Sequence, residues 1–310
     1  MEIPPAVSLS AAPPSHLMRL ATYAAIASAA LLVGVKTFAY FNTHSVALLS
    51  SLADSALDFM ASTVNLFAVR QSLTPADDDH RFGHGKAEPL SALAQSAFIA
   101  GSAVLLMVEA GSRVGHPEQV VNGDTAIVVM LLSTFVTFAL VAFQRFVVKR
   151  SGSIAIGADS LHYSGDVLLN VSVIVALVLA TRFDIAWADP IFGMGIALFL
   201  FINAMRIAVK AVAGLMDQEL PEADRQKIIA TAKLHPRVQN VHELRTRSSG
   251  LQQFIQMHIV LDKTLTLLDA HYISDEVEAA LQSEFPNADI IIHLDPEGVA
   301  EFHPRVGVGW

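Results

Sequence analysis

The chain has 310 residues, of which 53% are hydrophobic and only 16% are charged, and its net charge is −9. Soluble domains carry about 25% charged residues, and nucleic-acid-binding proteins need basic patches that neutralise phosphate, so both classes are disfavoured. The chain contains no cysteine, which excludes disulfides and thiolate metal sites and leaves His and carboxylate side chains as metal ligands.

The scarcity of charge is uneven along the chain. The 94 residues from Asp217 onwards include 23 charged ones, whereas the 216 residues before them include only 26. We therefore expect a membrane part followed by a soluble, acidic part. The predicted organisation is a flexible N-terminal tail over residues 1–16, a transmembrane domain over 17–211, a soluble domain over 212–300 and a C-terminal tail over 301–310.

Six segments approach the roughly 20 mostly apolar residues that a membrane-spanning helix requires. They are residues 17–41, 45–70, 89–108, 125–144, 154–181 and 191–211. The second and the fifth are unusual because acidic residues lie well inside them.

The distribution of Lys and Arg between the predicted loops indicates the orientation. One set of flanks holds nine basic residues: Arg19, Arg70, Arg81, Lys86, Arg145, Lys149, Arg150, Arg206 and Lys210. The opposite set holds only Arg113 and Arg182. Because basic residues accumulate on the cytoplasmic side, we expect both termini and the soluble domain to be cytoplasmic.

The soluble part has the pattern helix–strand–strand–helix–strand. A helix is expected from Pro221 to about Leu234, with proline at its start and acidic residues in its first turn. Residues 238–247 and 252–262 resemble strands joined by a Ser-Ser-Gly turn, and a helix over 268–285 precedes a short strand over 289–293. The predicted fold is thus an all-α membrane domain of six helices followed by a small α+β domain of the ferredoxin-like type.

Ionisable residues inside the spans form two pairs, each one helical turn apart. Asp54 and Asp58 lie in the second span, and His162 and Asp166 lie in the fifth. A carboxylate at the bilayer centre costs about 2.5–3.5 kcal/mol on insertion scales, so these groups need compensation from one another, from water or from a cation. Three carboxylates and one imidazole suit a borderline ion such as Zn²⁺, whereas Mg²⁺ and Ca²⁺ prefer all-oxygen sites.

A structural interpretation of these polar residues also exists. A lone intramembrane Asp often serves only as a hydrogen-bonding group between helices. Four ionisable groups at matched spacing favour the functional interpretation instead. For Lys36 in the first span two alternatives stay open, since its ammonium group either reaches the membrane surface or pairs with a carboxylate.

Three long motifs carry a resemblance to a known family. They are HSVALLSSLADSALD, PADDDHRFGHGKAEPLSALAQS and GADSLHYSGDVLLN. They resemble the cation diffusion facilitator family, in particular its bacterial zinc and ferrous-iron efflux branch, and the similarity extends over residues 21–296. This resemblance implies a homodimeric, multi-pass protein of the bacterial inner membrane that exports Zn²⁺, and also Cd²⁺ and Fe²⁺, in exchange for protons.

The same resemblance implies specific metal ligands in the membrane. The transport site would consist of Asp54, Asp58, His162 and Asp166. Asp159 precedes the last two by a turn and is a candidate either for the entrance to the site or for a supporting role behind it.

A second motif lies between the second and third spans. An acidic stretch that contains two His is, by itself, more typical of a solvated loop than of a ligand set. The resemblance implies a loop zinc site formed by Asp77, His80 and His84. It also implies that Lys86 and Asp217 form salt bridges that hold the dimer together near the membrane surface.

The soluble domain contains further His residues that, taken singly, would be read as surface or core residues. His293 and Asp295 share one face of the last predicted strand, because side chains alternate along a strand. The resemblance implies a binuclear zinc site, with structural or regulatory Zn²⁺ bridged by Asp295, formed by His242, His258, His271, His293 and Asp295. Leu294 departs from the family pattern, in which a polar residue stands at this position.

Two other function classes fit the sequence less well. An intramembrane hydrolase is disfavoured because HExxH is absent and four protein ligands would leave no open position for a catalytic water. A metal-sensing membrane receptor without transport has no use for ionisable groups at the bilayer centre. The sequence therefore predicts a transporter rather than an enzyme, with metal ions, protons, the lipid bilayer and a second copy of the chain as its partners and no nucleic acid.

Overall fold

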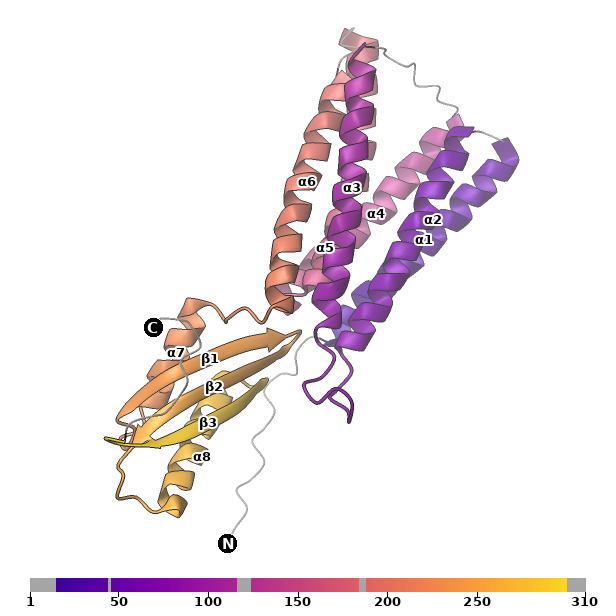
Figure 1. Ribbon diagram of the computed structural model, residues 1–310. Helices are drawn as coiled ribbons and strands as arrows, with labels where there is room; N and C mark the ends of the chain where they lie inside the picture. The colour runs from indigo at the N-terminus through magenta and orange to yellow at the C-terminus, as the bar shows by residue number, and fades with distance from the viewer. Residues whose placement is uncertain (1–14, 44–45, 116–123, 184–187, 300–310) are drawn as a thin grey trace. The chain divides into compact units, whose positions relative to one another are not determined.

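The computed structural model describes residues 15–43, 46–115, 124–183 and 188–299 (Figure 1). The described chain separates into a helical unit that ends at Met216 and an α+β unit that begins at Asp217. The first helix starts at Ser15, within the predicted N-terminal tail. The rest of that tail, and the predicted C-terminal tail over 301–310, lie outside the described residues.

Six long helices form the first unit. They are α1 (Ser15–Thr43), α2 (Val46–Ser72), α3 (Ala87–Gly115), α4 (Asp124–Ser151), α5 (Ile154–Phe183) and α6 (Ala188–Leu215). All six predicted segments are thus helical. Each helix has 27–30 residues, which at 1.5 Å per residue exceeds the roughly 30 Å of the hydrocarbon core.

The fifth helix carries three ionisable side chains inside its span. Among the described residues, α1, α2, α3, α4 and α6 are long and apolar enough to cross a membrane. Asp159, His162 and Asp166 lie within about two turns of α5. This helix packs against α3, α4 and α6, so that neighbouring helices surround these polar side chains.

Small residues bring the helices together. α3 packs along α6 and α1 along α2 (Figure 1). The side chains buried in α1 include Ala21, Ala25 and Ala29, and small residues of this kind allow close approach of helix backbones in membranes. Large apolar side chains such as Phe38 and Leu105 lie instead on the outer surface of the unit, more than 70% exposed. This distribution is the one expected of helices surrounded by lipid.

The second unit contains two helices and a three-stranded sheet. Its elements are α7 (Glu222–Lys233), β1 (Asn240–Ser249), β2 (Gln252–Leu261), α8 (Leu267–Glu284) and β3 (Ala288–Pro296). The strands lie in the order β1-β2-β3, with β1 antiparallel and β3 parallel to β2. The predicted α+β fold is confirmed. The turn is shorter than the predicted Ser-Ser-Gly: β1 continues through Ser249, and the turn consists of Gly250 and Leu251. Gly250 has φ +61°, which glycine adopts readily.

The core of this unit is built on the central strand. Ile255, Met257 and Ile259 of β2 are at most 1% exposed and alternate with more exposed residues, as side chains on opposite faces of a strand do. They pack against buried residues of both helices: Ile228 of α7, and Ile273, Val277 and Leu281 of α8.

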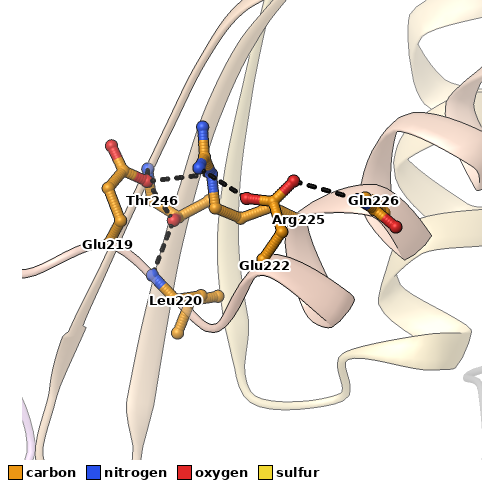
Figure 2. Close-up of polar contacts among 6 residues, drawn as sticks. All are labelled: Glu219, Leu220, Glu222, Arg225, Gln226 and Thr246. Atoms are coloured by element: carbon orange, nitrogen blue, oxygen red, sulfur yellow. Dashed lines mark hydrogen bonds and ion pairs between the residues drawn. The ribbon is translucent and has the colours of Figure 1, made fainter.

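Hydrogen bonds attach the segment before α7 to the first strand (Figure 2). The Leu220 backbone N–H donates to Thr246 Oγ1 at 3.0 Å, and the Thr246 backbone N–H donates to Glu219 Oε2 at 2.9 Å. The Thr246 hydroxyl also donates to the Glu219 carboxylate. Arg225 of α7 pairs with Glu222 at 2.9 Å, within the first turn of the same helix. These contacts position the start of α7 against the edge strand β1.

We expect Ile255→Ala to lower the free energy of unfolding of the α+β unit by about 2–5 kcal/mol, because it removes buried methyl groups and leaves a cavity in the core. Hydrogen exchange of the β2 amides in the full-length chain would measure the loss of protection. Gln256→Ala changes an exposed neighbour on the same strand and should alter protection by less than about 0.5 kcal/mol. Equal effects of the two variants would contradict this assignment of the core.

Candidate metal centres

The first candidate centre lies inside the helical unit, between α2 and α5. Asp58, His162 and Asp166 each offer a ligand atom, and these atoms lie within 4.8 Å of one another. The closest contact is a hydrogen bond of 2.8 Å between His162 Nε2 and Asp58 Oδ1. Both side chains are largely buried, with 15% and 17% exposure. The structure therefore brings together three of the four residues predicted for the transport site.

Asp54 is the fourth predicted ligand, and it occupies a different position. Its side chain is exposed and is not part of the group within 4.8 Å. It does line the same cavity of about 260 Å³ as the other three residues. Ile99 of α3 and Leu200 of α6 contribute apolar walls to this cavity, so the ionisable groups face a space bounded by apolar helices.

Asp159 supports the centre from within the helix bundle. It is 1% exposed, and its two carboxylate oxygens accept hydrogen bonds from Gln95 Nε2 of α3 at 3.0 Å and from Gln144 Nε2 of α4 at 2.6 Å. These contacts join α3 and α4 to α5, and they disfavour the prediction that Asp159 forms an entrance. Sequence reasoning missed both glutamines, although each is a polar residue in a span without charged residues.

Lys36 adopts neither of the two arrangements considered from the sequence. Its ammonium group is buried and donates to Ser55 Oγ at 2.6 Å and to the Ser51 carbonyl at 3.1 Å. It therefore does not extend to the membrane surface, and its bonded partners on α2 are neutral groups. Its positive charge acts on Asp58 and Asp54 through space, which partly offsets the negative charge of the centre.

The second candidate centre is the loop between α2 and α3. Ligand atoms of Asp77, His80 and His84 lie within 4.8 Å of one another. The turn between the two His includes Gly83 with φ +72°. The Asp77 carboxylate accepts the backbone N–H of His80 at 2.7 Å, and this hydrogen bond is the main cause that lowers the pKa of Asp77 below its ordinary value. Within the described chain, the buried His84 Nδ1 has no hydrogen-bond partner.

The third candidate centre lies on the sheet of the α+β unit. Strand register places His242 beside His258, and His258 beside His293, so one row of imidazoles crosses all three strands. Asp295 lies at the centre of this row: Oδ2 is 2.8 Å from His258 Nδ1 and 3.2 Å from His242 Nε2, and Oδ1 is 3.2 Å from His293 Nε2. Ligand atoms of His242, His258 and Asp295 lie within 4.8 Å of one another, and His293 lies outside this group but contacts the other oxygen of Asp295. Imidazoles gathered at a carboxylate are a donor set that fits Zn²⁺ or a similar divalent ion.

Two residues singled out from the sequence, His271 and Leu294, lie away from the row of imidazoles. His271 lies on α8, where it is exposed and faces Asp275 at 3.5 Å, and it does not belong to the group on the sheet. Leu294 is partly buried and packs against the apolar core. Since neighbouring side chains on a strand point to opposite faces, Leu294 points away from His293 and Asp295, and its apolar character suits that position.

Glu243 is a residue that sequence reasoning missed. The register of β1 and β2 shifts between His242 and Arg245, and Glu243 within this bulge has φ +48°, a conformation that non-glycine residues rarely adopt. Glu243 Oε2 lies 3.8 Å from His258 Nε2. No sequence pattern predicts this bulge, which brings a second carboxylate close to the row of imidazoles.

The predicted dimer residues have intramolecular partners within their own units. Lys86 Nζ donates to the Leu215 carbonyl at 3.0 Å, at the end of α6. Asp217 has φ +57° and pairs with Arg247 at 3.1 Å. The predicted role of Lys86 and Asp217 in holding a dimer together stays a prediction.

Comparison with known proteins identifies the family of both units. The family described as the cation efflux transmembrane domain matches residues 22–216, and the cation efflux protein cytoplasmic domain matches residues 220–297. The cation-efflux pump FieF of Yersinia enterocolitica is 44% identical over 285 residues, which cover 92% of this chain and 95% of that protein. The FieF pump of Klebsiella pneumoniae strain 342 is 44% identical over 286 residues, covering 92% and 94% of the two chains.

Among solved structures, the metal-bound C-terminal domain of the CzcD transporter from Thermotoga maritima is 27% identical and covers 26% of this chain and all of that one, with a TM-score of 0.25. The family matches and the full-length relatives, taken together with the six helices and the α+β unit, decide the classification. The chain is a multi-pass membrane protein that belongs to the cation diffusion facilitator family of cation efflux transporters.

Proposed function

We propose that this protein exports Zn²⁺, and also Cd²⁺ and Fe²⁺, from the bacterial cytoplasm in exchange for protons. The observation that carries the proposal is the group formed by Asp58, His162 and Asp166, held within 4.8 Å of one another inside the helical unit. Relatives that match nearly the whole chain bear the name cation-efflux pump.

The chemistry of the donors supports a borderline divalent cation as the substrate. One imidazole and several carboxylates fit Zn²⁺ and similar ions better than they fit Mg²⁺ or Ca²⁺. Carboxylates held close together inside a membrane repel one another and are costly to bury, so either protons or a divalent cation must neutralise them. We propose that Asp54, which lines the same cavity, is the fourth ligand.

The contact between His162 and Asp58 supports coupling between the two fluxes. A hydrogen bond of 2.8 Å between Nε2 and Oδ1 requires a proton on one of these atoms. A cation bound by both atoms must displace that proton, because metal ligands bind in their deprotonated form. Cytoplasmic metal would therefore release protons from the site, and protons from the opposite side would release the metal when the site faces outwards.

We also propose that the cytoplasmic sites bind Zn²⁺ and regulate a homodimer. The ligands would be Asp77, His80 and His84 in the loop, and His242, His258, His293 and Asp295 in the α+β unit. The segment from Asp217 onwards carries 8 basic and 15 acidic residues, so two copies repel each other, and bound cations would reduce that repulsion. Both termini would lie in the cytoplasm, as the excess of basic residues on those loops indicates.

Transport itself is tested with the purified full-length chain in liposomes that carry a pH gradient and an internal zinc-sensitive dye. We expect Asp58→Ala to lower Zn²⁺ flux to the level of protein-free liposomes, because it removes a ligand and the hydrogen-bond partner of His162. Asp289→Ala, which changes an exposed carboxylate on β3, should retain wild-type flux. A wild-type chain that binds Zn²⁺ without moving it would instead be a receptor.

The pH dependence of flux tests the role of His162. Imidazole is the side chain whose ordinary pKa lies nearest neutrality, so we expect its replacement in His162→Asp to shift the steep part of the flux–pH curve to lower pH. His235→Ala removes an imidazole that pairs with Glu276 in the α+β unit and should leave the curve unchanged. An unchanged curve for His162→Asp would show that the exchanged proton is carried elsewhere.

The sheet site is tested by Zn²⁺ titration of the full-length chain in an Asp58→Ala/His80→Ala background, which weakens the other two centres. We expect Asp295→Asn to reduce the remaining affinity by at least about tenfold, since Asp295 contacts three imidazoles. Asp289→Asn removes one charge from the same strand and serves as the matched control. Equal affinities in these two variants would locate the zinc elsewhere.

A further inference from the structure

A larger cavity, which the proposed transport function does not use, lies between α4, α5 and α6. Its volume is about 830 Å³, compared with about 260 Å³ for the cavity at the transport ligands. Four basic residues line it: Arg145 and Lys149 from α4, and Arg206 and Lys210 from α6.

The basic residues are arranged as two facing pairs. The members of each pair are four positions apart, so they project from the same side of their helix, and all four are exposed. Among the contacts of the described residues, none of the four pairs with a carboxylate. Four cations that share one cavity without an acidic partner repel one another, and an anion between them would relieve that repulsion.

The helix α5 contributes small and polar groups to the floor of the cavity. Gly157, Ser160 and Ser164 line it, and Ser164 Oγ accepts a hydrogen bond of 3.1 Å from Arg145 Nη2. Ser160 and Ser164 are each two positions from His162, so they project from the opposite side of α5, about 200° around the helix. The cavity is therefore separate from the candidate transport centre, and its positive charge makes it unsuitable as a path for divalent cations.

Apart from Asn203, the remaining lining is apolar. Phe199 and Val209 of α6 are 45% and 66% exposed and border the cavity together with Val148 and Leu161. Arg145, Lys149, Arg206 and Lys210 all lie toward the helix ends that the distribution of basic residues assigns to the cytoplasmic side. Basic pockets between helices at this level attract anionic lipid headgroups.

We propose that this cavity binds an anionic diacyl phospholipid. The phosphodiester lies between the basic pairs of α4 and α6, and the acyl chains lie along the apolar wall. Charge complementarity selects the headgroup, and the exposed Phe199 and Val209 distinguish a lipid from a soluble phosphate. The bound lipid joins α6 to the pair formed by α4 and α5.

Native mass spectrometry of the metal-free, full-length chain in detergent tests the proposal. Dioleoyl phosphatidylglycerol and dioleoyl phosphatidylcholine are the probes. We expect the wild-type chain to bind the anionic lipid at least about tenfold more tightly than the zwitterionic one. Arg206→Gln/Lys210→Gln should weaken binding of the anionic lipid roughly 30-fold, because each cation near an anionic headgroup contributes about a fivefold gain in affinity.

A matched pair of charge variants separates the site from general surface charge. Arg19→Gln/Arg70→Gln removes two exposed cations from α1 and α2 and should leave lipid binding unchanged. A second pair of variants tests the cavity itself. Gly157 lines the cavity, and an added Cβ there meets no atom within 4 Å, so a larger side chain at this position would fill the cavity. Gly34 of α1 is equally open but does not line the cavity, and it serves as the control. Gly157→Leu should abolish preferential binding, and Gly34→Leu should preserve it.

Three results would overturn the proposal. Equal binding of the two lipids by the wild-type chain would remove the headgroup preference. Equal losses in Arg206→Gln/Lys210→Gln and Arg19→Gln/Arg70→Gln would reduce the effect to surface charge. Displacement of bound lipid by inorganic phosphate at concentrations similar to those of phosphatidylglycerol would identify a soluble anion as the occupant. Because no metal is present in these measurements, their outcome is independent of the proposed transport function.

Discussion

The burial of ionisable groups among apolar helices is the constraint on which the membrane unit depends. Asp58 and His162 are in contact at 2.8 Å, and Asp166 completes a group whose charges cannot be dispersed by bulk water at that depth. Such groups are costly in a membrane unless each one is paired, hydrogen-bonded or neutralised by a bound ion. Either protons or a divalent cation can neutralise these buried groups, so the two can replace each other at the site.

Several neighbouring contacts follow from this constraint. The Asp159 carboxylate is held by two glutamine amides from different helices, and the Lys36 ammonium is held by a hydroxyl and a carbonyl of α2. A buried hydrogen bond of 2.7 Å between Ser62 and Tyr163 joins α2 to α5 close to the centre. These bonds connect α1, α3 and α4 to the two helices that bear the ligands.

In the α+β unit, strand register instead of helix spacing brings the candidate metal ligands together. Its imidazoles come from three strands and meet only because β1, β2 and β3 pair in one register, which places His242, His258 and His293 in a row. A shift of one residue in a strand would send its imidazole to the opposite face. Asp295, two residues beyond His293, then reaches all three rings.

Much of this protein could be inferred from local sequence. Hydropathy located all six helices, and the spacing of four between Asp54 and Asp58, and between His162 and Asp166, placed each pair on one side of its helix, because helical periodicity is a local property. The length of the first helix and the position of the hairpin turn were less accurate, since helix ends and turns depend on a few residues. Gln95, Gln144 and Glu243 escaped detection, because a polar residue acquires its role only from a partner far away in the chain.

Tertiary packing decided which of the candidate groups meet. The α2–α5 contact brings Asp58 to His162 and Asp166 while Asp54, one turn away, stays exposed at the cavity. On the sheet, pairing brings His242, His258 and His293 into contact with Asp295 and leaves His271 on α8 beside Asp275. Sequence spacing specifies the direction of a side chain relative to its own helix or strand, whereas the distance between two ligands depends on how those elements pack, and that is a property of the folded chain alone.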